Sequence, residues 1–313
     1  MAGSKAVVVV PAYNEGENLK VLIPELFATA GIILNLTLIV VDDGSNDSSS
    51  SIVDSLRGEH PNLILLRLPS RCGKARALSV GLREAISLDP EIVCIMDGDC
   101  QDNPIYLPLL AQKALSGFDL VTARRVNRAE KLPKRVSSKI YNRLVRFVFG
   151  VPGRDHNSGM KAFSPRLASF LVPFLHGDMH RHISVLAHWR GFSLSELSVM
   201  NRERKAGISK YGISRLWFGF EELLMVRFLL WRIDRRLDFI FYILLVGLVG
   251  VAAISAATSV FAGPMALFTN FPLLILSLAT MTFLVVAISA VGALRSGKFL
   301  RLVRAESNSA PGQ

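Results

Sequence analysis

A long stretch without charge near the carboxyl end constrains the fold of this chain more than any other feature. Residues 239–294 contain no Asp, Glu, Lys, Arg or His, and a helix needs only about 20 apolar residues to cross a bilayer. Gly263-Pro264 and Asn270-Phe271-Pro272 interrupt the stretch, which predicts two spans at about 239–262 and 271–294. The alternative is a buried helical hairpin in a soluble core, but such folds rarely hold so long a charge-free run.

Basic residues on both sides of this stretch predict its orientation. They are Arg227, Arg232, Arg235 and Arg236 before the first span, and Arg295, Lys298, Arg301 and Arg304 after the second. Because cytoplasmic flanks of membrane helices are rich in Arg and Lys, we expect an integral membrane protein with both termini cytoplasmic, in the plasma membrane if the source is prokaryotic. The hairpin would occupy residues 237–295, and residues 296–313 would form a basic cytoplasmic tail with a disordered end.

The overall composition favours contact with a membrane surface over contact with nucleic acid. The net charge is +11 and 50% of the residues are hydrophobic, an apolar excess that nucleic-acid binding would leave unexplained. The cysteines Cys72, Cys94 and Cys100 form no C-x-x-C pair, so a disulfide framework is not expected. The apolar run within the first ten residues is too short for a signal peptide.

The first two thirds of the chain alternates apolar runs with segments of helical spacing. The runs lie at 6–10, 36–41, 63–68 and from Ile92 onward, and the helical segments at 17–29, 48–57 and 74–87. This alternation predicts parallel strands joined by crossover helices. In such α/β sheets, ligands bind beyond the carboxyl ends of the strands.

Polar clusters follow three of the predicted strands at that end. They are Pro11-Ala12-Tyr13-Asn14-Glu15, Asp42-Asp43-Gly44-Ser45 and Asp97-Gly98-Asp99-Cys100-Gln101. Each could be a simple turn, but three at equivalent strand ends predict a nucleotide site. If the chain stays extended past Ile95, the side chains of Asp97, Asp99 and Gln101 share one face. Their oxygen atoms suit Mg²⁺ or Mn²⁺ held together with a diphosphate, although an acidic turn that caps a strand is the alternative.

With these clusters the chain resembles the GT-A fold family 2 glycosyltransferases. Within them it is similar to the polyprenyl-phosphate glycosyltransferases, such as dolichol-phosphate mannose synthase and the bacterial polyisoprenyl-phosphate glucosyltransferases. The segment Arg204-Lys205-Ala206-Gly207-Ile208-Ser209-Lys210-Tyr211 also carries the resemblance. It implies a cytoplasmic GT-A domain with a mostly parallel sheet at residues 1–212, and inverting transfer of a hexose from GDP-mannose or a UDP-hexose to dolichyl or undecaprenyl phosphate.

The resemblance also implies roles for individual residues. The donor nucleotide would contact Pro11, Tyr13, Asn14, Glu15, Asp42, Asp43, Lys74 and Asp97. The metal, Mg²⁺ or Mn²⁺, would be held by Asp97, Asp99 and Gln101. The catalytic residues would be Asp99, Arg204, Lys210, Asp155 and Asp178, of which Asp155 and Asp178 are expected to orient the sugar hydroxyls or Arg181. Asn103 departs from the relatives, where proline is common at this position.

Two amphipathic segments, at about 137–149 and 213–236, predict helices that lie in the membrane interface, although either could be a core-facing surface helix. In the first, Ile140, Tyr141, Leu144, Val145 and Val148 share one helical face and Asn142 lies on another. Cations are needed to receive a lipid phosphate. The candidates are Arg135, Ser138, Arg181, Arg204 and Lys210.

Two other functions stay open at this point. A polysaccharide-synthesising family 2 transferase should carry more membrane spans and a Q-x-x-R-W-type motif. A non-catalytic membrane partner that binds lipid phosphate should have lost the Asp97/Asp99 pair, which is present. The expected partners are therefore a nucleotide sugar, a polyprenyl phosphate and a membrane, without nucleic acid, and homo-oligomerisation is left open.

Overall fold

The computed structural model describes most of the chain up to residue 202 and four residues beyond it. The described residues are 3–31, 34–126, 132–202, Leu223, Val226, Arg227 and Leu230, with side chains omitted for 132–139. The chain divides into two compact units, Met1–Gly212 and Ile213–Gln313. In the second unit, Leu223, Val226 and Leu230 are buried and Arg227 is exposed.

The predicted membrane hairpin lies outside the described residues, as do most residues of the predicted second amphipathic helix. Among the described residues, no helix combines the length and the apolar character that a membrane crossing requires.

The first half of the unit Met1–Gly212 alternates strands and helices, as the sequence predicts. The elements are β1 (Lys5–Ala12), α1 (Gly16–Thr29), β2 (Asn35–Asp42), α2 (Ser49–Leu56), β3 (Leu63–Arg67), α3 (Lys74–Ser87) and β4 (Ile92–Ile95). The central strands are apolar throughout because both faces of the sheet are covered. Val7, Val8 and Val9, for example, are 0% exposed.

The second half adds three further strands, several short helices and the long helix α5. The elements are η1 (Pro104–Tyr106), α4 (Leu107–Leu115), β5 (Leu120–Val126), α5 (Leu132–Phe149), β6 (Lys161–Phe163), α6 (Pro165–Leu171), η2 (Val172–Phe174), η3 (Met179–His182), α7 (Ile183–Trp189) and β7 (Leu194–Met200). Local signals set some of these bounds. Ser164, for example, caps α6 by accepting from the Leu167 N–H at 3.3 Å.

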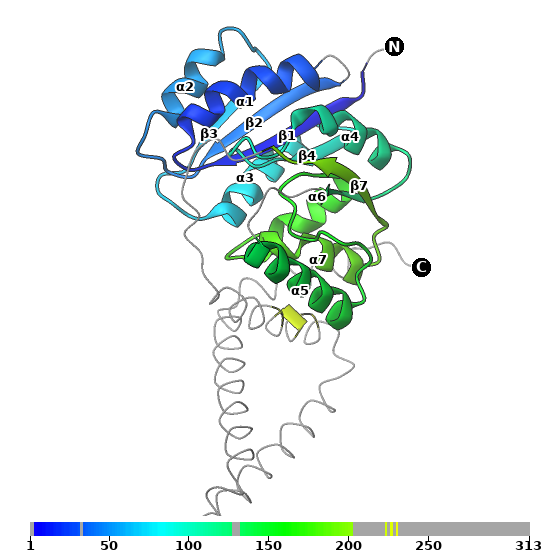
Figure 1. Ribbon diagram of the computed structural model, residues 1–313. Helices are drawn as coiled ribbons and strands as arrows, with labels where there is room; N and C mark the ends of the chain where they lie inside the picture. The colour runs from blue at the N-terminus through cyan, green and yellow to red at the C-terminus, as the bar shows by residue number, and fades with distance from the viewer. Residues whose placement is uncertain are drawn as a thin grey trace, which may run out of the picture. The chain divides into compact units, whose positions relative to one another are not determined.

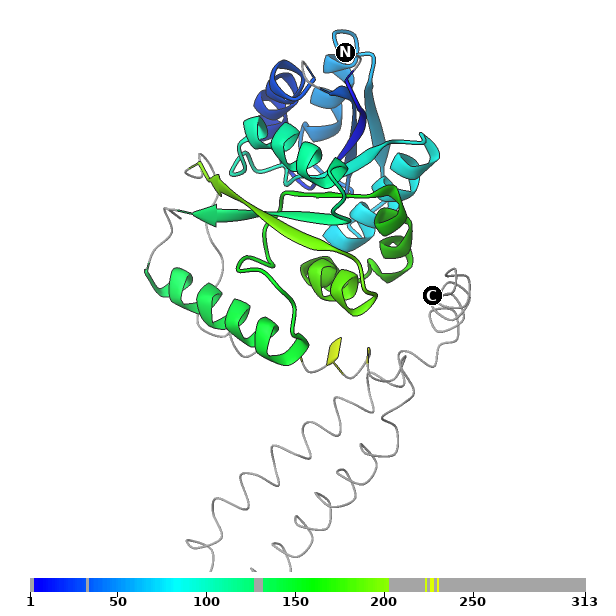
Figure 2. The same ribbon diagram turned by 90° about the vertical axis from the view of Figure 1, so that its right-hand side faces the viewer.

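The seven strands of the described residues form one sheet in the order β3-β2-β1-β4-β6-β5-β7. β1 is parallel to β2 and β4, and β2 is parallel to β3, whereas β6 runs antiparallel to both β4 and β5. β5 and β7 pair in parallel at the far edge, as Figure 2 shows. The carboxyl ends of β1, β2 and β4 therefore meet at one edge of the sheet.

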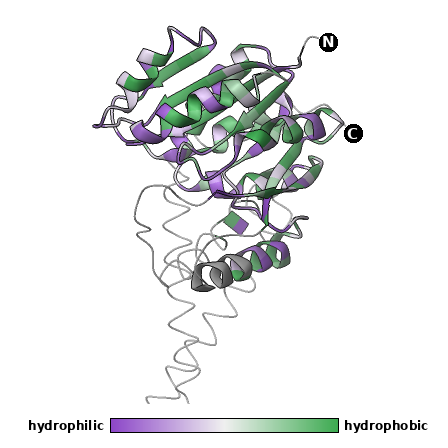
Figure 3. Ribbon diagram, turned by 45° about the horizontal axis from the view of Figure 1, so that its top comes forward, coloured by the Kyte–Doolittle hydropathy of each residue, from purple (hydrophilic) through white to green (hydrophobic). Residues whose placement is uncertain are grey.

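Helices cover both faces of the sheet (Figure 1). α1, α2 and α4 pack with Val8, Val40 and Cys94 in one apolar core. Val9 and Val41 point to the opposite face, against α3. Figure 3 shows the strands coloured mainly as hydrophobic, whereas the covering helices carry both hydrophobic and hydrophilic residues. The result is a three-layer α/β fold, as the alternating sequence pattern predicts.

Helix α5 differs from its prediction in its start and in one residue of its apolar face, since Tyr141, Leu144 and Val148 are half-buried and Val145 is buried as expected. It begins at Leu132 rather than near residue 137. Val145 is 1% exposed, but Ile140, which was expected on the same apolar face, is exposed, as is Phe147. Asn142 is also buried, and its side-chain oxygen accepts a hydrogen bond from the His156 N–H at 3.2 Å. A buried polar group is tolerated when it has such a partner.

Candidate functional site

The turns after β1 and β2 are joined by hydrogen bonds, so the first two polar clusters lie side by side. Asn14 has a left-handed backbone with φ of 56°, which asparagine tolerates better than most residues. Its N–H donates to the Ser45 hydroxyl at 2.9 Å, and its side-chain oxygen accepts from the Asn46 N–H at 3.0 Å. The register that pairs Ala12 with Asp42 brings both turns to the same edge of the sheet.

Asp42 and Asp43 are both buried, and both accept hydrogen bonds from the chain itself. Asp42 accepts from the Ser45 N–H at 2.9 Å and so fixes its own turn. Asp43 accepts from the N–H groups of Cys72 and Gly73 at 2.7 and 2.8 Å, which ties down the loop before α3. Contact of either carboxylate with a nucleoside stays a prediction.

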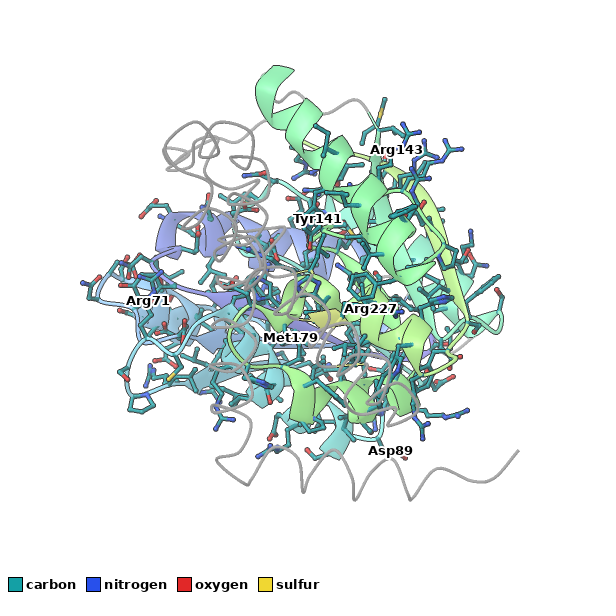
Figure 4. All side chains as sticks on the ribbon, turned by 90° about the horizontal axis from the view of Figure 1, so that it is seen from below. Arg71, Asp89, Tyr141, Arg143, Met179 and Arg227 are labelled. Atoms are coloured by element: carbon teal, nitrogen blue, oxygen red, sulfur yellow. The ribbon has the colours of Figure 1, made fainter. Side chains whose placement is uncertain are left out.

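The loop before α3 also packs closely on the first two clusters. Gly44 has a φ of 71°, and a Cβ there would lie 2.5 Å from the backbone of that loop, so only glycine fits. The guanidinium of Arg71, labelled in Figure 4, lies 4.3 Å from the ring centroid of Tyr13. Pro11, Tyr13 and Glu15 are half-buried. The contacts of Asp43 and Tyr13 thus join the turns after β1 and β2 to the loop before α3.

Asp97, two residues past β4, forms an ion pair with Lys74, the first residue of α3. Lys74 Nζ and Asp97 Oδ1 are 2.5 Å apart, and the two side chains are about one third exposed. Burial by itself raises the pKa of Asp97, but the charge and hydrogen bond of Lys74, together with the positive charge of Lys161, hold that pKa below its usual value. The prediction that Lys74 begins a helix is confirmed, and its contact with a diphosphate stays a prediction.

A second segment of the chain supports Asp97 from the other side. A Cβ at Gly159 would lie 2.5 Å from the carboxyl carbon of Asp97 and 2.6 Å from Oδ2. No real side chain tolerates such distances, so glycine is required for this close approach. The Asp97 carboxylate is therefore held between the Lys74 ammonium and the backbone at Gly159.

The other two predicted metal ligands lie on a tight turn, so the expectation of an extended strand with alternating side chains is wrong. β4 ends at Ile95, and Asp99 Oδ1 accepts from the Gln101 N–H at 3.2 Å across Cys100, whose φ is 57°. Aspartate commonly forms such turns with the backbone two residues on. Asp97, Asp99 and Gln101 are all half-buried rather than packed away from solvent.

The side-chain oxygens of Asp97, Asp99 and Gln101 suit a hard cation, although they are few. Among the described residues, no three His, Cys, Asp or Glu side chains gather into a group that could hold a metal. Two carboxylates and one amide would contribute oxygen ligands, and Mg²⁺ and Mn²⁺ commonly take their remaining ligands from water and substrate phosphates. The chemistry of the side chains is therefore compatible with a metal bound together with a diphosphate.

Asp155 is buried and held by Arg125 at the end of β5. Arg125 Nε lies 2.8 Å from Asp155 Oδ2 and Nη2 lies 3.0 Å from Oδ1, a bidentate pair with side chains 15% and 3% exposed. The Asp155 N–H donates to Glu196 of β7 at 2.9 Å. The predicted active-site acid is thus fixed by neighbours from β5 and β7.

Two buried charged residues received no role from the sequence. Lys161 in β6 is 2% exposed and donates to the Ser158 carbonyl, and burial lowers its pKa to about 8. Asp102 is 4% exposed, and burial together with the negative charge of Asp97 raises its pKa to about 7. A signal for Lys161 was present in the sequence, because this lysine stands between the apolar residues Met160 and Ala162.

The segment around η3 carries the remaining described candidates. Arg181 Nη2 lies 3.8 Å from Asp178 Oδ1, and Asp178 is exposed. Between them, His180 is half-buried, and burial followed by the positive charge of Lys74 lowers its pKa to about 3. The imidazole of His180 is therefore neutral at physiological pH.

Four candidates for the acceptor phosphate cannot be placed. Arg204 and Lys210 lie outside the described residues. Arg135 and Ser138 belong to α5, but their side chains are not described. Their roles stay predictions.

Comparison with known proteins identifies a family and several relatives. The family model described as Glycosyl transferase family 2 matches residues 7–171. An undecaprenyl-phosphate 4-deoxy-4-formamido-L-arabinose transferase from Pectobacterium atrosepticum is 30% identical over 211 residues, which are 67% of this chain and 63% of that protein. The protein of the same name from Photorhabdus laumondii is 30% identical over 68% of this chain and 64% of its own length. The chain thus matches less than two thirds of the length of these relatives.

A solved structure shares the fold. The mannosyltransferase PcManGT from Pyrobaculum calidifontis, in complex with GDP-Man and Mn²⁺, aligns with a TM-score of 0.53 at 20% sequence identity. The alignment covers 99% of this chain and 81% of that one. At this identity the likeness concerns the arrangement of the backbone.

Proposed function

The chain belongs to glycosyl transferase family 2, and on this premise we propose that it transfers a sugar from a nucleotide sugar to the phosphate of a polyprenyl phosphate. The observation that carries the proposal is the Asp97-Gly98-Asp99 turn, which lies beside the ends of β1 and β2 with Lys74 against it. The name of the relatives that are 30% identical supports the class of acceptor.

The donor nucleotide is assigned to the surface formed by the turns after β1 and β2 and the loop before α3. The carboxyl edge of a parallel sheet is the usual site of nucleotide binding. The N-terminus of α3 and the Lys74 ammonium lie at that edge and attract the negative charge of a diphosphate. Lys74 would exchange part of its contact with Asp97 for a contact with the phosphate oxygens.

A divalent cation is assigned to Asp97, Asp99 and Gln101. When bound, it would offset the charge that builds up on the departing nucleoside diphosphate. The Mn²⁺ in the complex of PcManGT supports this assignment, and either Mg²⁺ or Mn²⁺ suits the oxygen donors.

The acceptor needs positioning more than it needs a base. A phosphate monoester has a second pKa near 6, so at neutral pH its oxygen can attack the anomeric carbon without losing a proton to the enzyme. Asp155, fixed by Arg125, is assigned to orientation of the sugar, and Arg181 with Asp178 to the acceptor side. Arg204, Lys210, Arg135 and Ser138 would neutralise the lipid phosphate. Attack opposite the leaving group inverts the anomeric configuration.

Membrane attachment follows from the second unit and from α5. We assign the spans to about 239–262 and 271–294, after an interfacial helix at 213–236, with the catalytic unit cytoplasmic. The exposed residues of α5 support contact of this helix with a membrane surface. Phe147 is 87% exposed, and Arg143 and Arg146 are exposed on the same helix. In Figure 4, Arg143 and Tyr141 lie on different sides of α5. Aromatic and basic side chains together are typical of the headgroup region.

The test is transfer of label into lipid. Membranes from cells that express the chain are incubated with undecaprenyl or dolichyl phosphate, Mn²⁺ and a panel of radiolabelled nucleotide sugars, including a nucleotide-activated 4-deoxy-4-formamido-L-arabinose. We expect label in the organic-soluble fraction that depends on the chain, the lipid phosphate and the metal. Transfer to a soluble acceptor, or none with any donor, would overturn the proposal.

A further inference from the structure

Arg202, two residues beyond β7, joins three segments of the described unit. Its Nη1 donates to Glu25 Oε2 at 2.7 Å, and Nη2 donates to the other Glu25 oxygen and to Asn103 Oδ1, the latter at 2.8 Å. Its backbone N–H donates to the Gln101 carbonyl at 2.9 Å. One residue thus connects α1, through Glu25, with the turn that carries the assigned metal ligands.

Asn103 is the second side chain, after Glu25, that the Arg202 guanidinium contacts. Its side-chain oxygen accepts from Arg202 and also from the Ile105 N–H at 3.2 Å, which caps η1. Proline is common at this position in the proteins that the chain resembles, and its side chain could accept neither of these hydrogen bonds. The amide of Asn103 therefore explains a departure from the family pattern that the sequence alone leaves without a reason.

The contacts are stronger than those of an ordinary surface ion pair. The Arg202 and Glu25 side chains are 34% and 24% exposed, and the guanidinium contacts both carboxylate oxygens. Bidentate pairs of arginine with a carboxylate fix orientation as well as contributing energy. Because the same guanidinium also binds Asn103, the backbone from Gln101 to Asn103 cannot shift without breaking charge-assisted bonds.

We infer that Arg202 and Asn103 are positioning residues for the assigned metal site. They hold the carbonyl of Gln101 against the end of β7, and so keep the Gln101 side chain within reach of the cation that Asp97 and Asp99 bind. This inference rests on the proposed function, because it concerns the affinity of the same site. Residues that orient metal ligands typically change metal affinity by about 10–100-fold when they are replaced.

The test measures metal binding directly rather than through turnover. The full chain in detergent, with GDP or UDP present, is titrated with Mn²⁺ while the electron paramagnetic resonance signal of free Mn²⁺ is recorded. We expect Arg202→Met to weaken Mn²⁺ binding by about 10-fold, Asn103→Pro to weaken it by a smaller factor, and Arg202→Lys to restore part of the loss. Thermal unfolding of each variant is measured alongside.

The matched control is Arg57→Met, which removes an exposed arginine whose partner Asp54 lies 3.7 Å away in α2. It should leave Mn²⁺ affinity unchanged. Wild-type Mn²⁺ affinity in folded Arg202→Met, or in Asn103→Pro if Arg202→Met does not fold, would overturn this inference alone. Absence of Mn²⁺ binding by the unaltered chain would overturn the metal assignment of the proposed function as well.

Discussion

The polar residues of the first and second halves of the sheet are held in different ways. At the ends of β1 and β2, Asn14, Asp42 and Asp43 are fixed mainly by hydroxyl and backbone N–H groups of adjoining turns. Between β5 and β6, Arg125 and Asp155 are fixed by a buried ion pair. Because breaking a buried ion pair is costly, we expect a change at Arg125 to affect stability more than a change at a half-buried turn residue such as Asp99.

The largest effect is expected where the second region is broken. Arg125→Met leaves the Asp155 carboxylate buried without its bidentate partner, and such changes cost about 3–5 kcal/mol. The free energy of unfolding of the full chain in detergent should fall by that amount. The double variant Arg125→Met/Asp155→Asn should recover much of the loss, because both charges are then absent. If Arg125→Met has nearly wild-type stability, the expected difference between the two regions does not exist.

The converse effect is expected at the turn to which we assign the metal. Asp99→Asn should lower sugar transfer by at least about 100-fold, because one charged ligand is lost from the site of developing charge. Its free energy of unfolding should change by less than about 0.5 kcal/mol, since Asp99 is half-buried and asparagine can still accept from the Gln101 N–H. Transfer rate and unfolding are measured on the same preparation. A large loss of stability would mean that this turn, too, serves the fold.

The buried charges of the second region also predict a pH dependence. His156 is 2% exposed, and burial followed by the positive charge of Lys161 lowers its pKa from 6.5 to about 4. His156 is therefore protonated below about pH 6.5 in the unfolded chain but only below about pH 4 in the folded chain. The stability contributed by neutral His156 is present above pH 6.5 and is lost as the pH falls toward 4.

His156→Leu removes this dependence. When the pH falls from 7.5 to 5, the free energy of unfolding of the unaltered chain should fall by about 2 kcal/mol more than that of the variant. Urea denaturation at the two pH values measures it. An identical pH slope in both proteins would show that folding does not shift the pKa of His156.

The smallest effect is expected at the outer surface of α5. Phe147→Ser should weaken the apparent affinity for the lipid acceptor by about fivefold, equivalent to about 1 kcal/mol of lost apolar contact with the membrane. The affinity for the nucleotide sugar should not change. Val21→Ser, which alters an apolar residue of α1 that is 50% exposed, is the matched control. Equal responses of the two variants would remove α5 from the membrane interface.

Local sequence patterns were sufficient to predict the helices and strands in the first half of the fold. The helix predicted at residues 74–87 is Lys74–Ser87 in the structure, and the strands predicted at 6–10 and 36–41 are each longer by one or two residues at their ends. Each of these elements is marked by a continuous apolar run or by helical spacing, and both are patterns of residues close together in the sequence. The positions of the polar clusters at strand ends also predict from the sequence that Asn14, Asp43 and Asp97 lie at one edge of the sheet.

Contacts between distant segments decided the rest. Asp97-Gly98-Asp99 was expected to extend a strand, but a hydrogen bond between Asp99 and the Gln101 N–H turns the chain. The buried face of α5 depends on Asn142, whose partner His156 is 14 residues away. Periodicity along the sequence cannot report such partners, because it describes only which residues share a face.

By itself, the sequence determined the family, the parallel core of the sheet and the residue types at its carboxyl edge, because these follow from local order and from motifs. Only the tertiary structure decided that Gly159 lies against Asp97, that Lys161 is buried and that Arg202 meets Glu25 and Asn103. The physical reason is that burial and ion pairing arise between segments up to 177 residues apart, whose approach is set by the packing of the whole sheet and its helices.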